Sequence, residues 1–285
     1  MPRPIRRCPH ADVQYAANEK NQQQPSHPMT FAKYQGTGND FILIDDRAGT
    51  FPVADRALVA HLCHRRFGIG ADGLILLQLH PDYDFRMVYF NADGAEGSMC
   101  GNGGRCTVRF AHDLGIFQTH TRFLAIDGEH EATVFEEHID LKMSDVTHLD
   151  TYPDYCFLNT GSPHVVKVVA GLDQFDVVAE GRNLRHDPAF APGGTNVNFV
   201  EKTTDGHLAV RTYERGVEAE TYSCGTGVTA VALVAHRQLG LPGPVTIQTP
   251  GGQLQVRFQA NPGGSFTNIY LSGPAVRVFG GTVLV

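Results

Sequence analysis

The sequence lacks two features that would assign it to well-defined classes of protein: a long apolar run and an excess of basic residues. No apolar run approaches the roughly 20 residues that a membrane-spanning helix needs. Basic residues are in deficit, with 23 Lys and Arg against 30 Asp and Glu and a net charge of −7. Because nucleic-acid phosphates favour a basic surface, this balance argues against a nucleic-acid partner. We therefore predict a protein that binds neither membranes nor nucleic acid.

Cysteines are few and widely spaced, with six in 285 residues and no C-x-x-C pair. This pattern does not match a disulfide framework of a small secreted protein. The spacings do not suggest a zinc site either, and we predict no metal. A chain of this length buries enough surface to fold without such cross-links. The expected class is a cytoplasmic globular protein of about two domains, which its 42% apolar and 19% charged residues also indicate.

The first 28 residues differ in character from the rest. They contain three arginines, several prolines and a polar run from Asn18 to Gln24, without any apolar periodicity. They also lack the apolar segment of a secretory signal. We predict that residues 1–28 form a disordered extension that is dispensable for folding and turnover.

From Met29 onward the pattern is typical of many short strands and two conspicuous helices, at 102–114 and 225–238. A shorter amphipathic helix is expected at 54–65. Strands are expected at 41–45, 74–79, 85–91, 122–127, 132–135, 139–143, 165–169, 196–201, 208–213, 245–249, 254–258 and 268–271.

The two conspicuous helices form part of an internal repeat. Each follows a C-G-x-G turn, Cys100–Gly103 in the first copy and Cys224–Gly227 in the second, and the residues behind the turns also align. We infer an α/β (α+β) fold of two related halves, 29–146 and 147–271. Each half is expected to be a mostly antiparallel sheet wrapped around one central helix.

A cysteine directly before a helix has distinctive chemistry. The first-turn N–H groups lack intrahelical partners and the helix dipole is positive there, so both effects favour a thiolate. We therefore expect the pKa values of Cys100 and Cys224 to lie below that of a free thiol. The same N–H groups can hold a carboxylate. Two facing helix starts would place one thiol on each side of a substrate α-carbon, a geometry suited to inverting that centre without a cofactor.

These motifs resemble the diaminopimelate epimerase family over almost all of the chain after Met29. The matching segments are Phe31–Lys33, Gly36–Phe41, Gly68–Gly73, Phe90–Gly94, Met99–Cys106, Gly161–His164, Tyr213–Gly216 and Cys224–Gly227. The resemblance implies a site in the cleft between the halves and interconversion of LL- and meso-diaminopimelate, in lysine and peptidoglycan precursor biosynthesis. It also implies a pyridoxal-independent reaction, a homodimer, and a last segment, 272–285, that returns to the first half.

The resemblance also implies roles for individual residues. Cys100 and Cys224 match the two acid/base thiols, and His164 and Glu214 match the residues that assist them. The positions matching substrate-binding residues are Asn39, Asn91, Gly101, Asn102, Ser162, Asn196, Glu214, Arg215, Gly225 and Thr226. Arg105 and Asp72 are interpreted as structural support.

Two positions depart from the family pattern. Ser162 stands where asparagine is usual, and Gly73 stands where some members have glutamine; either change would tune the site toward another amino acid. The alternative hypothesis is therefore a two-cysteine racemase of the same fold with a different substrate. A non-catalytic small-molecule binder is a third reading, which retention of both cysteines argues against. Arg215 distinguishes diaminopimelate from the alternative substrates, because only a substrate with a second carboxylate needs this residue.

Overall fold

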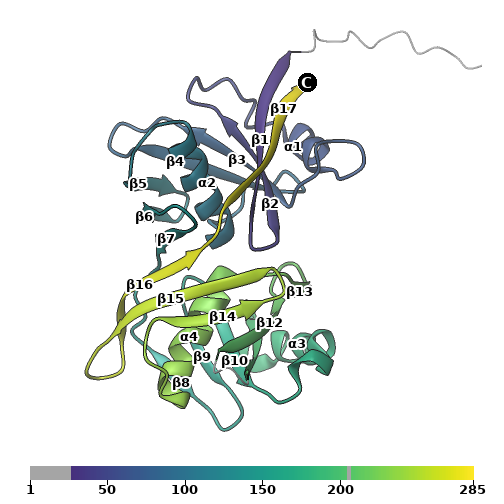
Figure 1. Ribbon diagram of the computed structural model, residues 1–285. Helices are drawn as coiled ribbons and strands as arrows, with labels where there is room; N and C mark the ends of the chain where they lie inside the picture. Colours follow the sequence, from purple (N-terminus) through teal and green to yellow (C-terminus); the bar gives the residue numbers. More distant parts are fainter. Residues whose placement is uncertain (1–26, 204–206) are drawn as a thin grey trace, which may run out of the picture.

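The computed structural model describes residues 27–203 and 207–285, which form two lobes (Figure 1). The predicted disordered extension, 1–28, lies outside the described residues except for its last two. Those two belong to a sheet: the backbone of His27 pairs with Val285, and Pro28 begins the first strand. The ordered fold therefore starts slightly earlier than the sequence pattern indicates.

The first lobe contains strands β1 to β7 and two helices. Most neighbouring strands are antiparallel, while β2 with β3 and β4 with β5 are parallel. The elements are β1 (Pro28–Gly36), β2 (Asn39–Asp45), α1 (Arg56–Cys63), β3 (Gly73–Gln78), β4 (Phe85–Asn91), α2 (Gly101–Asp113), β5 (His120–Ala125), β6 (Gly128–Val134) and β7 (Ile139–Lys142).

The second lobe repeats this arrangement. Its parallel pairs are β10 with β11 and β12 with β14, and its other neighbours are antiparallel. The elements are β8 (Leu149–Thr151), β9 (Cys156–Asn159), β10 (Pro163–Val168), η1 (Leu172–Gln174), α3 (Val177–Arg185), η2 (Pro188–Phe190), β11 (Asn196–Lys202), β12 (Leu208–Glu214), β13 (Ala219–Thr221), α4 (Gly225–Leu239), β14 (Val245–Thr249) and β15 (Gly252–Ala260).

Strands β16 (Phe266–Gly273) and β17 (Val276–Leu284) connect the lobes. β16 pairs with β15 on one side and with β7 on the other, and β17 then pairs antiparallel with β1 along its length. Figure 1 shows this yellow segment running from the second lobe to the top of the first. The C-terminal strand thus completes the sheet in which the described chain begins.

The sequence pattern did not indicate α3, β8, β9 or β13. Helix α3 has nine residues with Gly181 at its centre, and glycine weakens a helical signal by about 1 kcal/mol relative to alanine. The glycine is needed because a methyl group there would lie 2.4 Å from Tyr213 Cβ. The missed strands have only three or four residues each, too few to show alternation.

Helices α2 and α4 form the centre of the molecule. Ten of the 13 residues of α2 and ten of the 15 residues of α4 are buried, which is typical of a helix enclosed by sheet. Their N-terminal ends meet: a methyl group built on Gly225 would lie 3.3 Å from the Gly101 Cα. Each glycine follows one cysteine, so the packing brings the two C-G-x-G turns to one place. Within the described residues, no helix is long and apolar enough to cross a membrane.

Two buried thiols that are not at a helix start make the fold sensitive to alkali. Burial raises the pKa of Cys63 and of Cys106 to about 12, whereas an unfolded thiol ionises near pH 8.5. The folded chain keeps protons that the unfolded chain releases between these values, so stability is full below pH 8.5 and falls as the pH rises. We expect a loss of roughly 2 kcal/mol per thiol between pH 8.5 and 10.

Urea unfolding under reducing conditions at a series of pH values measures this loss. In Cys63→Ala the slope of the unfolding free energy against pH should be shallower than in the parent chain by the contribution of one thiol. An unchanged slope in that variant would contradict the raised pKa.

Candidate active site

A cavity of about 1250 Å³ lies where the two helix starts meet. It is lined by residues of both lobes, including most of those singled out from the sequence. These are Asn39, Asn91, Cys100, Gly101, Ser162, Asn196, Glu214, Arg215, Cys224, Gly225 and Thr226. Asn102 and His164 do not line it; both are fully buried behind its wall.

The two cysteines occupy equivalent positions, each as the N-cap residue of its helix and each half-buried. The N–H groups of Gly103 and Asn102 donate toward the Cys100 thiol, and Gly227 N–H donates toward Cys224. These donors lower the thiol pKa values, as the helix-start argument predicts. Burial is the larger effect, and it raises the pKa of Cys100 and takes that of Cys224 to about 12.

The expectation of a depressed thiol pKa is therefore wrong. A thiolate loses most of its hydration in the cavity. The two N–H donors at Cys100 and the one at Cys224 do not replace that hydration. Glu214 adds to the effect, because its negative charge lies near both sulfurs. Burial in turn raises the pKa of Glu214 itself. The cavity thus holds three groups that all resist ionisation together.

His164 contacts Cys224 through one intervening hydroxyl. Its Nε2 lies 2.9 Å from Thr226 Oγ1, which lies 3.5 Å from the Cys224 sulfur. Nε2 also lies 2.9 Å from Ser162 Oγ. Burial, with a smaller contribution from the charge of Arg215, lowers the pKa of His164 to about 3. The ring is therefore neutral at physiological pH.

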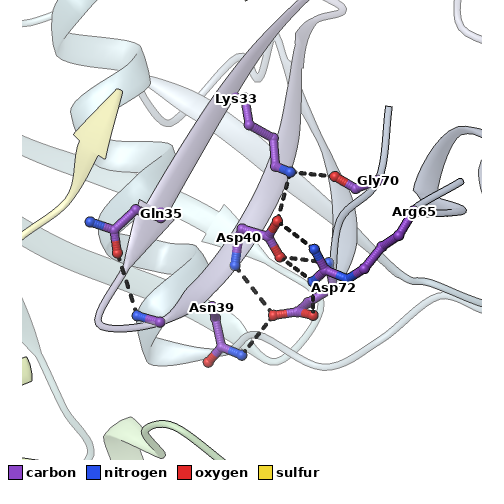
Figure 2. Close-up of polar contacts among 8 residues, drawn as sticks. Lys33, Gln35, Asn39, Asp40, Arg65, Gly70 and Asp72 are labelled. Carbon is purple, nitrogen blue, oxygen red and sulfur yellow. Dashed lines mark hydrogen bonds and ion pairs between the residues drawn. The ribbon is translucent and has the colours of Figure 1, made fainter. Parts of the chain in front are cut away.

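Asn39 is held at the cavity wall by a network of charged side chains (Figure 2). Its Nδ2 donates to Asp72 at 3.0 Å, and Arg65 bridges Asp72 and Asp40 at 2.7 and 2.6 Å. Buried Lys33 donates to Asp40 at 2.6 Å and to the Gly70 carbonyl. Burial opposes ionisation of Asp40, but donation from Arg65 and Lys33 outweighs it and lowers its pKa to about 2. This anionic pair determines which way the Asn39 amide faces.

Asn102 has its side chain fully engaged with the protein. Its Nδ2 donates to Asn39 Oδ1 at 2.6 Å and to the Ser223 carbonyl at 3.1 Å, and its Oδ1 accepts from Arg105 at 2.9 Å. The bond to Ser223 links the two lobes across the helix starts. Only the backbone of Asn102 is left to interact with a ligand.

Arg105 is a fully buried guanidinium that the sequence pattern indicated only as structural support. Among the described residues no carboxylate lies within ion-pair distance of it. It donates instead to Asn102 Oδ1, to Thr37 Oγ1 at 3.1 Å and to the Gly101 carbonyl at 3.3 Å. The ionised forms of Cys106 and Cys100 are the charges that favour its cationic state. The first helix start therefore has a positive charge directly beneath it.

Arg215 is the cavity-lining cation that has no acidic partner within the described part of the chain. Arg65 and Lys142 also line the cavity, but they pair with Asp72 and Glu131 respectively. The Arg215 backbone N–H donates to Asn196 Oδ1 at 2.9 Å, and Asn196 Nδ2 donates to Ser162 Oγ at 3.2 Å. An anionic group on a ligand would find this guanidinium free.

The two departures from the family pattern have different positions. Ser162 lines the cavity and joins the hydrogen bonds of Asn196 and His164. Gly73 does not line the cavity, and a methyl group on it would lie 2.4 Å from the Tyr89 ring and 2.6 Å from the Phe90 carbonyl. Of the two, only Ser162 is placed to contact a ligand.

Sequence reasoning missed Asn198, which contacts His164 Nδ1 from behind at 3.1 Å. A signal was present: Asn196 and Asn198 lie two apart in an otherwise apolar strand and therefore face the same side.

Comparison with known proteins matches this chain to the family model described as diaminopimelate epimerase, over residues 31–149 and 156–278. It is 50% identical over 258 residues to a diaminopimelate epimerase of Flavobacterium psychrophilum, covering 90% of this chain and 100% of the relative. It is 48% identical to one of Chlorobaculum tepidum, covering 87% and 98%. An enzyme of Aquifex aeolicus with the same name is 38% identical, with 89% and 97% covered.

Two solved structures show the same fold at low sequence identity. A Bacillus anthracis phenazine biosynthesis protein of the PhzF family has a TM-score of 0.73 and 15% identity, covering 91% of this chain and 100% of that one. A hydroxyproline epimerase from Agrobacterium vitis has a TM-score of 0.65 and 16% identity, covering 90% and 93%. The fold class predicted from the repeat is confirmed. The model match and the identities over nearly whole chains show that this chain belongs to the diaminopimelate epimerase family, whose members are isomerases.

Proposed function

We propose that this chain interconverts LL- and meso-diaminopimelate by a pyridoxal-independent reaction in which Cys100 and Cys224 are the acid and the base. The observation that carries the proposal is the meeting of two cysteine-capped helix starts in one cavity, beside an arginine that has no acidic partner in residues 27–203 and 207–285. The first arrangement suits inversion of an α-carbon, and the second suits a substrate with a distal carboxylate.

In one direction the thiolate of one cysteine takes the α-proton and becomes a thiol. The electron pair left on the α-carbon spreads into the substrate carboxylate, and first-turn N–H groups of α2 and α4 stabilise the charge that develops there. The other thiol then donates its proton to the opposite face and becomes a thiolate. The reverse reaction exchanges the two roles, so each cysteine is acid in one direction and base in the other.

The raised pKa values give the remaining groups their roles. The reaction needs one cysteine as the thiolate base and the other as the thiol acid. One proton must therefore be shared among the two sulfurs and their neighbours. We assign Glu214, near both sulfurs, to exchange that proton with the thiols. We assign His164, neutral and linked through Thr226, to donate a hydrogen bond that favours the Cys224 thiolate.

We assign substrate binding to the residues that line the cavity together with the backbone at the two helix starts. Gly101, Asn102, Gly225 and Thr226 surround the reacting carboxylate, while Arg215 grips the distal one. The other contacts are Asn39, Asn91, Ser162, Asn196 and Glu214. In this proposal each half supplies one thiol: 29–146, completed by 272–285, supplies Cys100, and 147–271 supplies Cys224.

We further propose a cytoplasmic location, because the chemistry requires reduced thiols. Five of the cysteines lie in the described residues and all are free. The cytoplasm keeps thiols reduced. Cell fractionation that placed the protein in an oxidising compartment would contradict this.

A homodimer is also part of the proposal. Strand β17 has one edge paired with β1 and exposes Val276, Val278 and Phe279, which are about half accessible. Exposed apolar residues on a sheet edge are typical of a surface that is covered in an assembly. Sedimentation velocity distinguishes the dimer from a monomer.

Incubation with LL-diaminopimelate in deuterated buffer under reducing conditions tests the function. We expect deuterium at one α-carbon and formation of the meso isomer, since the proton delivered to the new face comes from an enzyme group that has exchanged with solvent. Proline, hydroxyproline and histidine serve as control substrates. Turnover of one of these with no exchange in diaminopimelate would favour the alternative, a racemase of the same fold with a different substrate.

A further inference from the structure

Asn198 lies behind the cavity wall, where its hydrogen bonds to Val165 and Thr212 determine the orientation of its amide. It is fully buried on β11, between β10 and β12. Its Nδ2 donates to the Val165 carbonyl at 2.9 Å, and its Oδ1 accepts from Thr212 Oγ1 at 3.0 Å. A flipped amide would set its oxygen against a carbonyl oxygen, so the nitrogen must face Val165. The C-G-x-G motif makes room for this amide, since a methyl group on Gly227 would lie 2.4 Å from Asn198 Oδ1.

The same Nδ2 lies 3.1 Å from His164 Nδ1. Because this neighbour is a donor, Nδ1 must accept and carries no hydrogen. A neutral ring then carries its single hydrogen on Nε2, which lies 2.9 Å from both Thr226 Oγ1 and Ser162 Oγ. The orientation of a buried amide therefore decides the tautomer of His164.

The tautomer in turn directs the Thr226 hydroxyl. When Thr226 Oγ1 accepts from His164, its own hydrogen is free to point elsewhere. The Cys224 sulfur lies 3.5 Å away and Ser162 Oγ 3.3 Å away. Ser162 already accepts from Asn196, whereas a thiolate is a charged acceptor and forms the stronger bond. A hydrogen bond donated to the ionised form of Cys224 favours that form.

We propose that Asn198 is a positioning residue for Cys224: it holds His164 as the Nε2–H tautomer and thereby aims the Thr226 hydroxyl hydrogen at the Cys224 sulfur. The proposal rests on the proposed function in assigning Cys224 an acid/base role. Asn198 itself does not line the cavity and has no contact with the substrate site. Charged groups also act on this series of hydrogen-bonded side chains: Arg215 acts on His164, and Glu214 and Cys100 act on Cys224.

The tautomer can be observed without substrate. Nitrogen-15 NMR of the full chain labelled at histidine, with His164 assigned from a His164→Gln difference spectrum, distinguishes a protonated from an unprotonated ring nitrogen. We expect Nδ1 unprotonated and Nε2 protonated from pH 5 to pH 9. A protonated Nδ1 in the parent chain would overturn the proposal, and this measurement does not depend on any variant folding or on the substrate being diaminopimelate.

Asn198→Asp then tests the consequence. The carboxylate has nearly the same shape but only accepts, so Nδ1 should become protonated and the neutral ring should present a bare Nε2. The Thr226 hydrogen would then point at His164 and not at Cys224. In the direction in which Cys224 is the base, we expect kcat/KM at pH 9 to fall about tenfold to a hundredfold and KM to change less than about threefold. The acidic limb of the pH–rate profile, which reports ionisation of that base, should move up by about one unit.

Thr212→Val is the matched control. It removes another bond to the same amide and should destabilise the fold comparably, but the Val165 carbonyl still orients Asn198. We expect its tautomer and pH–rate profile to match those of the parent. If both variants lost activity in parallel with unfolding stability, or if Asn198→Asp protonated Nδ1 without loss of kcat, Asn198 would have only a structural role. Absence of α-proton exchange in the parent chain would sink the proposed function and leave the tautomer result standing.

Discussion

Replacing either Cys100 or Cys224 by alanine is expected to reduce epimerisation at least about a thousandfold, the upper part of the range for loss of a general acid or base. Each half-reaction needs a proton acceptor on one face and a donor on the other, so neither thiol can substitute for its partner. The two helix starts are equivalent in position, and both variants should therefore fail in both directions. Conversion of LL- to meso-diaminopimelate and back, followed chromatographically, measures the loss.

Cys156→Ala is the appropriate control, since that thiol is buried on β9, does not line the cavity and does not belong to a helix start. It should keep turnover within about threefold at neutral pH while losing some stability, because a small side chain leaves a cavity. Normal epimerisation by either Cys100→Ala or Cys224→Ala would show that the two-thiol mechanism is wrong.

Arg215→Met should lower kcat/KM for diaminopimelate on the order of a hundredfold, which corresponds to about 3 kcal/mol for a charge-assisted bidentate contact. Arg215 is expected to bind the distal carboxylate, so the effect should appear mainly in KM. L-Lysine, which is diaminopimelate without that carboxylate, provides the matched substrate. We expect α-deuterium exchange into lysine to be slow in the parent chain and no slower in Arg215→Met.

Together the two substrates and two proteins form a double-mutant cycle that isolates the contact between Arg215 and the distal carboxylate. Lys142→Met is the control variant, because Lys142 lines the same cavity but is already paired with Glu131 at 3.3 Å. It should change kcat/KM by less than about threefold. Equal losses on diaminopimelate and lysine in Arg215→Met would indicate that Arg215 supports the fold of the site and does not select the substrate.

The sequence could predict those properties of the site that depend only on residues close together along the chain. A cysteine followed by Gly-x-Gly and an apolar helix acts through the N–H groups of one helical turn, and these lie within four residues of the sulfur. The duplication of that pattern predicts two halves, 29–146 and 147–271. The structure has two lobes with two parallel strand pairs each, and the bounds of the halves stay a prediction. The elements that sequence reasoning missed are short or, like α3, contain a glycine that only packing requires.

The acidity of the thiols shows where local reasoning stops. The helix-start donors act on each sulfur as expected, but burial outweighs them and raises both pKa values. Burial is produced by strands from elsewhere in the chain, so no local pattern reports it. The same holds for Arg105 of α2: its place in the motif indicates structural support, but no local pattern reports that it is fully buried.

By itself the sequence determined the family and the repeat, and it singled out eleven of the residues that line the cavity, the two half-buried thiols among them. Only the tertiary structure decided how those residues are held: Asn39 by Asp72, 33 positions away, and His164 by Asn198, 34 positions away. It also decided which cation lacks a carboxylate partner among the described residues: Arg65 and Lys142 are paired there, and Arg215 is not. The physical reason is that hydrogen-bond partners and loss of hydration depend on distance in space, whereas a motif reports only neighbours along the chain.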